Sequence, residues 1–485
     1  MLHTYKLLLA LFPLLLLSGC ANPSWTAAGK IVPPVYKVCP LEGKWTVTQN
    51  LAPEGYAGET NLPAEGGTAQ FTRELAVLGG YVWNKPSYKI KKVNSTDYLM
   101  TRYIALNNYF VSMNKEVDVV TVYANLNFLG EFMKINDATV IAFVQNKALL
   151  LRKISDQADS PLPVADTNIR DTNNESNIGT SGIFIGLKIP SNNGYTYETL
   201  WVASDDKKLR PVLTRNNIFF PRNSGFWELQ VRSDLKNGTA ELFARDTAVK
   251  DSATQGVSEE TSLQQAQKRN TAIAIDYIGN DYIAIENITA GTSILQVLPV
   301  DKLSTQIGVK VSDLLGAKGL TAYRSAREQA LRSLRDEGVA LLDEVADEEN
   351  FGLTRKNGHW YLQGRINYQR NGMAETREFP INIIPPANLI LYDTLYLSWQ
   401  NIKDRVPNAL DVFTSPNKDI AIIETKNKLY IYGISDEKLD SLPMGEIEIR
   451  EGETVIMAEW ATGSYVDIWE RAFLVNDAQV GENAP

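Results

Sequence analysis

The sequence predicts a mainly β protein, with a small antiparallel β-barrel near the amino terminus followed by a larger body of repeated β units and one helical insert. Three observations lead to this prediction. Short alternating or β-branched runs recur between polar turns, two pairs of stretches in the larger body match at a nearly constant offset, and a segment between the matched copies has a helical period. A chain of 485 residues is long enough for two or three domains, each with its own core.

Residues 1–19 have the pattern of a cleavable signal peptide. Lys6 precedes the apolar run 7–17, which is too short for a membrane helix of about 20 residues and is interrupted by Pro13. The run ends in Leu17-Ser18-Gly19-Cys20. After it, residues 20–39 are rich in Pro and small residues, which is typical of a spacer.

The segment Leu17-Ser18-Gly19-Cys20 resembles the lipobox of bacterial lipoproteins. The resemblance implies cleavage before Cys20, a diacylglycerol thioether on its sulfur and an acylated amino group, so that acyl chains on Cys20 hold the protein at a membrane. At roughly 0.8 kcal/mol per buried CH₂, one chain holds only marginally and three anchor almost permanently. In that family an Asp after the Cys favours the inner membrane, so Ala21 favours the outer membrane of a Gram-negative cell. The alternative is an ordinary secretory signal in which the Cys occurs by chance.

Charge and composition limit the possible partners and chemistry. The chain has 57 acidic and 48 basic residues, a net charge of -9, which argues against nucleic acid as a main partner. Once the signal is removed, Cys39 is the free thiol and His359 the remaining His, so zinc sites of several His and Cys are excluded, and we expect no metal or cofactor. His359 matches Phe226 in the other repeat copy, which favours a packing or surface position over a catalytic one.

Residues 40–155 are predicted to form the barrel. Alternating or β-branched runs indicate a closed or nearly closed antiparallel sheet, with strands near 43–48, 70–77, 88–93, 98–104, 117–126, 131–135, 139–144 and 148–154. The opening Gly43-x-Trp45 is similar to the start of lipocalin-like barrels. That resemblance implies that Trp45 closes the barrel floor and that the barrel holds an apolar ligand; the alternative is that Trp45 is simply a core residue.

A polar linker, 156–182, leads to the repeated body, 183–475. The segment 222–232 matches 355–365 in its Arg, Gly, Trp, Leu, Gln and Arg positions, and 281–286 matches 419–424. The two offsets are 133 and 138 residues, so the matches are collinear and indicate two copies of one β unit. We expect residues 476–485 to be a tail.

Within the second copy, four short strands follow one another near 410–413, 420–424, 429–434 and 446–450, with Pro, Asn and Lys at the bends. This rhythm resembles a β-propeller blade, and a propeller-like body of five to seven blades would fill the region. The alternative is a pair of stacked β-sandwiches.

The insert 312–349 has a helical period, with a short turn at 312–315 and a longer helix over 321–349 that Gly338 bends or interrupts. Its apolar stripe packs on the β body or is offered to a partner. The stripe comprises Tyr323, Ala326, Ala330, Leu331, Leu334, Leu341, Leu342 and Val345.

Candidate catalytic groups are few. Asp281 and Asp419, and likewise Glu286 and Glu424, recur between the copies, which favours structural roles such as turn formation. Two Ser-x-x-Lys matches, 204–207 and 435–438, fall in polar turns without companion motifs, so we interpret them as chance.

Most aromatic residues of the body are expected to be core, but the segment from Trp460 to Trp469, centred on Gly463-Ser464-Tyr465, has loop character. Trp460, Tyr465 and Trp469 are therefore a possible binding surface, or else core. The favoured function is a non-enzymatic envelope lipoprotein that binds or scaffolds an envelope protein partner. The alternatives are a lipocalin-like carrier of an apolar ligand and a carboxylate-dependent envelope hydrolase.

Overall fold

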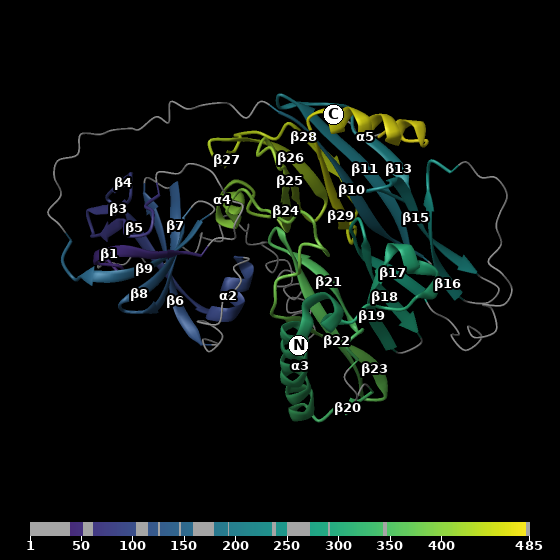
Figure 1. Ribbon diagram of the computed structural model, residues 1–485, viewed down its shortest axis with the longest axis horizontal. Helices are drawn as coiled ribbons and strands as arrows, with labels where there is room; N and C mark the ends of the chain where they lie inside the picture. Colours follow the sequence, from purple (N-terminus) through teal and green to yellow (C-terminus); the bar gives the residue numbers. More distant parts are fainter. Residues whose placement is uncertain are drawn as a thin grey trace, which may run out of the picture.

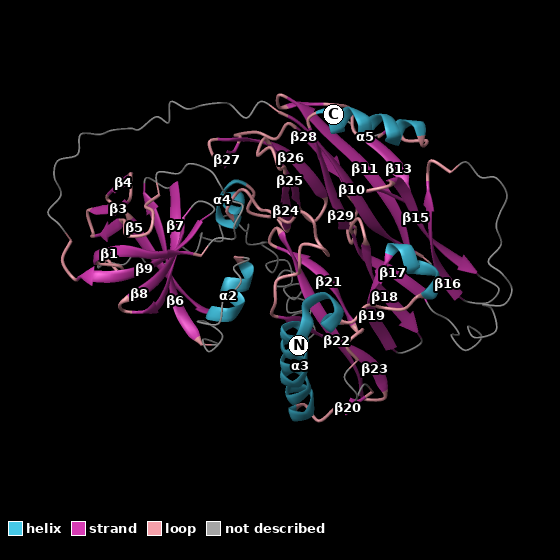
Figure 2. Cartoon of the chain, viewed as in Figure 1, coloured by secondary structure: helices cyan, strands magenta, loops and turns pink. Residues whose placement is uncertain are grey.

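The computed structural model describes residues 39–51, 62–102, 115–124, 127–144, 147–158, 179–192, 194–234, 239–249, 272–289, 292–342 and 347–481. These residues form a smaller amino-terminal sheet and a larger β body (Figures 1 and 2), as the predicted mainly β class requires. The predicted signal peptide, Cys20 and most of the polar linker lie outside the described residues. In the part that is described, no helix is long and apolar enough to cross a membrane.

The amino-terminal sheet, sheet A, is a nine-stranded antiparallel meander in the order β4-β3-β2-β1-β9-β8-β7-β6-β5. β1 and β9, the first and last strands of this sheet along the chain, pair with each other, so the sheet curls into a half-barrel. Its two edge strands are β4 and β5, and the chain turns sharply between them through Lys85 and Pro86. The strands are β1 Gly43–Asn50, β2 Thr68–Phe71, β3 Leu75–Leu78, β4 Tyr81–Asn84, β5 Ser87–Asn94, β6 Glu116–Ala124, β7 Asn127–Asn136, β8 Thr139–Val144 and β9 Lys147–Ser155.

The concave side of sheet A is filled by its own side chains. Trp45, Phe71 and Phe132 are at most 2% exposed and belong to one apolar cluster. The rings of Phe71 and Phe132 meet edge to face at 5.0 Å. Trp45 also donates its indole N–H to the carbonyl of Leu41 at 2.8 Å, so its one polar atom is satisfied inside the core.

Two expectations for this region are wrong. The predicted strand 98–104 is helix α2, Ser95–Thr101, in its described part, because the Asn94 side chain accepts hydrogen bonds from the backbone N–H groups of Thr96 and Asp97. The predicted strand 70–77 is two strands, β2 and β3, because the Thr72 hydroxyl accepts from the N–H of Leu75 at 2.9 Å and turns the chain. Helix α2 covers the convex side of the sheet with a second apolar cluster, so the central strands are buried on both faces.

The body contains five antiparallel sheets among the described residues, which follow one another along the chain except that the last strands return to the first sheet. Sheet B comprises β10 Thr180–Ser191, β11 Gly194–Asp205, β12 Lys208–Leu209, β13 Leu213–Asn216, β29 Thr454–Thr462 and β30 Gln479–Val480. Sheet C comprises β14 Ile218–Arg222, β15 Gly225–Asp234 and β16 Thr239–Asp246, and sheet D comprises β17 Ala272–Ile278, β18 Tyr282–Thr289 and β19 Thr292–Pro299.

The remaining two sheets fill the second half of the body. Sheet E comprises β20 Ala340–Leu341, β21 Phe351–Lys356, β22 His359–Arg370 and β23 Met373–Ile381. Sheet F comprises β24 Asp411–Thr414, β25 Ile420–Glu424, β26 Lys428–Ser435, β27 Lys438–Leu439 and β28 Gly445–Glu448. The four strands predicted near 410–450 are therefore confirmed, whereas the expected tail contributes β30, which pairs with β13.

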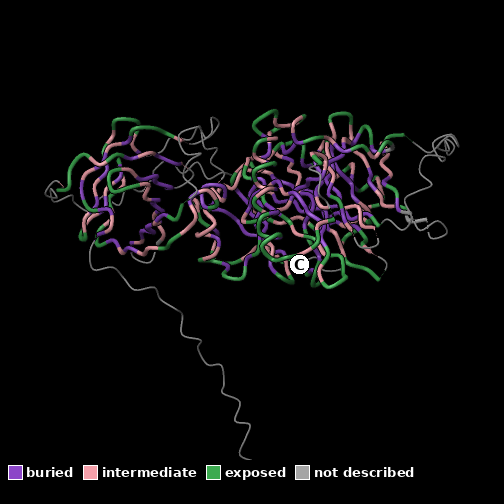
Figure 3. Tube along the Cα trace, turned by 90° about the horizontal axis from the view of Figure 1, so that it is seen from below, coloured by how far each residue is buried: buried purple, intermediate pink, exposed green. Residues whose placement is uncertain are grey.

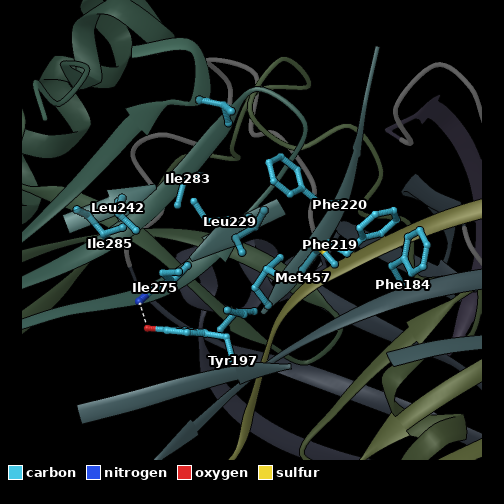
Figure 4. Close-up of a cluster of buried hydrophobic side chains, with 14 of the residues drawn as sticks. Phe184, Tyr197, Phe219, Phe220, Leu229, Leu242, Ile275, Ile283, Ile285 and Met457 are labelled. Carbon is cyan, nitrogen blue, oxygen red and sulfur yellow. Dashed lines mark hydrogen bonds between the residues drawn. The ribbon is translucent and has the colours of Figure 1, made fainter. Parts of the chain in front are cut away.

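Apolar clusters join sheets B, C and D, sheets D and E, and sheets B and F, and Figure 3 shows buried residues inside each part of the molecule. Sheets B, C and D share the cluster drawn in Figure 4, where phenylalanines of sheets B and C face isoleucines of sheet D. At one edge of this cluster, the backbone N–H of Ile275 donates to the Tyr197 hydroxyl at 3.0 Å. A different cluster joins the other face of sheet B to sheet F.

The described helices of the body flank these sheets. They are the 3₁₀ helix η2 Val300–Thr305, α3 Val311–Asp336, α4 Trp399–Arg405 and α5 Ser464–Val475. The stripe of α3 packs on sheet E, where the rings of Tyr323 and Phe379 of β23 lie 5.7 Å apart, so it packs on the β body as one of the two sequence interpretations expects. The predicted helix over 321–349 ends at Asp336, because Gly338 takes a positive φ of 70° and redirects the chain into β20.

The repeated Arg of sheet C reaches across to the next sheet. Arg222 lies at the tip of β14, and its guanidinium sits 4.9 Å from the ring centre of Trp227. It donates to the carbonyl of Asn280 and to the carboxylate of Asp301, both at 2.8 Å, and both partners belong to the region of sheet D. In this first copy, the Arg of the Arg-x-x-Gly-x-Trp repeat therefore connects sheet C to sheet D.

The second copy makes the same connection between sheets E and F, but in a buried setting. Arg355 lies 5.4 Å from the ring centre of Trp360 and forms ion pairs with Asp393 at 2.9 Å and Asp411 at 2.8 Å. It also donates to the carbonyl of Val412 at 2.8 Å. All three charged side chains are less than 10% exposed.

The two hairpins differ in register although their residues align. Arg222 pairs directly with Gly225 across the turn 223–224, whereas the turn of the second copy is 357–358, between Lys356 and His359. The repeat therefore preserves the Arg–Trp contact and the link to the next sheet, but not the position of the hairpin tip.

We predict that Arg355→Met lowers the free energy of unfolding of the body by about 3–5 kcal/mol, because it leaves two buried carboxylates without their counter-ion. The aligned change Arg222→Met should cost only about 1 kcal/mol, since the carboxylates of Asp281 and Asp301 are exposed to solvent. Urea denaturation followed by Trp fluorescence measures both. Equal losses in the two variants would contradict this assignment.

Candidate functional site

The structure separates the three aromatic residues that the sequence groups as a possible binding surface. Trp460 lies on β29 and faces the cluster between sheets B and F, while Trp469 lies on α5 and packs on the opposite face of sheet B. Tyr465, at the start of α5, is 61% exposed. The expected loop is wrong, because 460–462 continue β29 and helix α5 begins at Ser464.

Helix α5 packs on aromatic rings of sheets B and C. Trp469 stacks on Phe184 with ring centres 5.3 Å apart and planes 9° from parallel, and it meets Phe226 edge to face at 5.9 Å. Phe473, one turn further on, lies 5.0 Å from Phe184. Aromatic pairs of this kind each contribute roughly 0.5–1.5 kcal/mol beyond the area they bury. The inner face of α5 is thus fixed on the sheet.

The close approach of these rings depends on Gly182 in β10. A Cβ built at this residue would lie 2.4 Å from the ring of Trp201, which is fully buried beneath α5. Trp201 donates its indole N–H to the carboxylate of Glu470 at 3.1 Å, and this bond ties the ring to the helix above it.

Arg210 forms ion pairs with acidic residues on one side of the same helix. Arg210 contacts Glu470 and Asp467 of α5, each at 2.9 Å, and Asp205 of β11 at 2.7 Å. Its hydrogen bonds, chiefly the one to Asp205, raise the pKa of the guanidinium, and in turn they lower the pKa of the Asp205 carboxyl. Helix α5 is therefore held from below by rings and from the side by charge.

Held in this way, α5 presents a row of apolar side chains away from the sheet. Tyr465, Ile468, Leu474 and Val475 are 61%, 51%, 48% and 77% exposed. We call these four residues the outer stripe of α5. Large apolar side chains gathered on a fixed element are the usual chemistry of a protein-binding surface, so the outer stripe is the candidate functional site.

Sequence reasoning found Tyr465 but missed Ile468, Leu474 and Val475. The signal that could have found this face is the helical spacing of positions 465, 468 and 475 in a segment interpreted as a loop.

Two carboxyl groups inside the body have strongly raised pKa values. Burial raises the pKa of Glu459 on β29 to about 8. Burial, with the nearby Asp411 carboxylate, also raises the pKa of Glu424 on β25 to about 8, against the opposing effect of Arg355. Both side chains keep some solvent-accessible surface, yet enough protein surrounds them to make ionisation costly. They are neutral at pH 7 and can donate a hydrogen bond there.

The other repeated acidic residues have structural roles. Asp419 is buried at the β24–β25 turn, and its carboxylate accepts the hydrogen bond of the Ser181 hydroxyl, whose oxygen lies 2.8 and 2.9 Å from the two carboxylate oxygens. This bond links sheet F to sheet B. Asp281 lies 3.5 Å from Arg222, and Glu286 pairs with Arg365 at 2.5 Å. Each joins neighbouring sheets.

The two Ser-x-x-Lys matches lie in hairpin turns, as predicted, but the structure brings them together. Lys207 of the first contacts the hydroxyl of Ser435 of the second, and it lies 3.6 Å from Asp440. The Ser435 hydroxyl in turn donates to Asp440 at 2.6 Å. Lys207, Ser435 and Asp440 therefore connect a hairpin turn of sheet B to one of sheet F.

The remaining sequence candidates lie within packed or hydrogen-bonded surroundings. His359 is buried, and its Nδ1 lies 3.0 Å from the carbonyl oxygen of Asp393. Trp45 lies in the core of sheet A. Cys39 is buried at the edge of the same core, and burial raises the pKa of its thiol. Over the described ranges, no three His, Cys, Asp or Glu side chains are placed to hold a metal ion.

Comparison with known proteins gives no family. No family model and no curated protein matches the chain. Among solved structures, a candidate 6-phosphogluconolactonase from Bacteroides uniformis shares 10% identity over 88% of this chain and 100% of its own, with a TM-score of 0.10. A TM-score this low carries no argument about fold or function.

We predict that Glu459→Gln makes the protein more stable than the wild type at alkaline pH. The folded-state pKa of about 8 lies above the ordinary value of 4.5, so the wild type loses stability as pH rises between these values, and the loss is complete above pH 8. Glutamine does not ionise, so the difference in melting temperature between variant and wild type should grow from pH 5 to pH 8 and then level off.

Melting curves from pH 5 to pH 9 test this, with exposed Glu451→Gln as the matched control. If the difference in melting temperature between Glu459→Gln and the wild type stays constant with pH, the raised pKa assigned to Glu459 is wrong.

Proposed function

We propose that this protein is a bacterial envelope lipoprotein, anchored through acyl chains on Cys20, that acts as a binding or scaffolding module for an envelope protein partner. The observation that carries the anchoring is Leu17-Ser18-Gly19-Cys20, whose Leu17 ends the apolar run 7–17 of eleven residues. Ala21 supports placement at the outer membrane in a Gram-negative cell. The anchor would hold a body whose surface, rather than a deep catalytic centre, meets other molecules.

A propeller-like arrangement of the body fits this role. Its five described sheets follow one another along the chain, and β29, near the end of the chain, pairs with β10, the first strand of the body. A pair of stacked sandwiches would not require this closure, whereas rings of β-sheets use it to fix their last blade. Such a body is rigid, and it carries α5 on the sheet where the ring closes.

The binding role is favoured over that of a carrier by the interior of sheet A. Phe71, Phe132 and Trp45 fill the space that an apolar ligand would take in a lipocalin-like barrel. By contrast, the outer stripe of α5 leaves large apolar side chains exposed on a fixed helix, which is how protein-binding surfaces present their anchors.

The anchoring is tested by Cys20→Ser in the full chain, expressed in a Gram-negative host. We expect the precursor to remain unprocessed, and the protein not to incorporate labelled fatty acid. The matched control is Cys39→Ser, which leaves the signal segment intact and should be lipidated like the wild type. If Cys20→Ser is still cleaved and labelled, the proposed anchor is wrong.

A further inference from the structure

Two hairpin turns of sheet E carry the same dipeptide. Asn357-Gly358 joins β21 to β22, and Asn371-Gly372 joins β22 to β23. The φ angles are 54° and 85° in the first turn and 52° and 80° in the second, so both are type I′ turns. An Asn-Gly pair is chemically labile, because Gly has no side chain to shield its backbone nitrogen. The two turns therefore differ only in the surroundings that the fold gives them.

We propose that Asn371 is a site of spontaneous deamidation in the folded protein, whereas Asn357 is protected from the same reaction. The backbone nitrogen of Gly372 attacks the side-chain carbonyl carbon of Asn371 and gives up its proton. The bond from that carbon to Nδ2 breaks, and Nδ2 leaves with the proton as ammonia. Water then opens the resulting succinimide ring at either carbonyl, which gives aspartate or isoaspartate. The inference does not depend on the proposed anchoring.

Ring closure requires the peptide between Asn and Gly to rotate. In a type I′ turn the ψ angle of the first central residue is about 30°, which directs the next nitrogen away from the Asn side chain. Turning the peptide over, into the type II′ form with ψ of about −120°, brings that nitrogen to the side-chain carbon. The reaction is therefore fast only where this peptide is free to turn.

The peptide of the first turn is held on both sides of Gly358. Its N–H donates to the buried carboxylate of Asp411 at 2.5 Å, and its carbonyl accepts from the guanidinium of Arg355 at 3.0 Å. A Cβ built at Gly358 would lie 2.8 Å from a methyl group of Leu395, so the space around the turn is also filled. Rotation would leave a buried carboxylate without this donor, which protects Asn357.

The second turn has none of these restraints. Asn371 and Gly372 are both exposed, and a Cβ built at Gly372 would meet nothing within 4 Å. Among the described residues, none accepts a hydrogen bond from the Gly372 N–H. The Gln369 side chain donates to the Gly372 carbonyl at 3.1 Å, but that carbonyl belongs to the following peptide. The peptide between Asn371 and Gly372 can therefore turn.

Deamidation at this turn acts on the link between α3 and sheet E. Arg370 and Arg377 contact Glu337, the residue that follows α3, at 2.5 and 3.2 Å. Either product adds a negative charge next to Arg370, where it competes with Glu337 for the guanidinium. Isoaspartate also adds one carbon to the backbone of a two-residue turn, which no longer fits the type I′ geometry.

The experiment is peptide mapping of the purified full-length chain during incubation at mildly alkaline pH. Trypsin cleaves after Lys356 and Arg370, so each Asn begins its own peptide. Digestion in ¹⁸O-labelled water marks any deamidation that occurs during handling. We expect Asn371 to convert several-fold faster than Asn357, with isoaspartate among its products. No conversion of Asn371, or conversion no faster than that of Asn357, would overturn the proposal.

The matched control is the same incubation in urea. Unfolding removes the bond between Gly358 and Asp411, so Asn357 should accelerate and the two rates should become similar. If the rates differ as much in urea as in the folded protein, the flanking residues rather than the fold set the difference, and the protection assigned to Asn357 is wrong.

Discussion

The pairing of β10 with β29 is the constraint on which the rest of the body depends. These strands are more than 260 residues apart in sequence, yet Ser181 lies opposite Thr462 and the ladder continues to Lys188 and Thr454. The pairing brings the end of the chain onto its first long sheet. It also creates the surface on which α5 rests, because Phe184, the main ring beneath Trp469, stands on β10.

Charged and polar side chains determine how the sheets are joined around this closure. The apolar clusters hold neighbouring sheets together but do not specify a unique alignment, since apolar contact is non-directional. Arg355 with its two buried carboxylates, Asp419 with Ser181, and Arg222 with Asp301 each allow one arrangement of two sheets. Such groups contribute little net stability when they are buried, and we interpret their role here as alignment of the sheets.

Local sequence signals were sufficient where one short-range interaction decides the structure. The turns of sheet F and the apolar stripe of α3 follow from Pro, Asn and helical spacing alone. They were insufficient at 95–101, where alternation suggested a strand but the cap made by Asn94 starts a helix, and at 337–349, where Gly338 ends one. In both places a single backbone interaction outweighs the pattern of side chains.

By itself, the sequence determined the mainly β class, the repeat and the candidate lipidation signal, because each is written in residues adjacent along the chain. Only the tertiary structure decided that Trp460 and Trp469 lie on opposite faces of one sheet, that Lys207 meets Ser435, and that α5 exposes apolar side chains to solvent. These depend on strands from distant parts of the chain being set side by side, and residue spacing carries no information about which strand will be the neighbour.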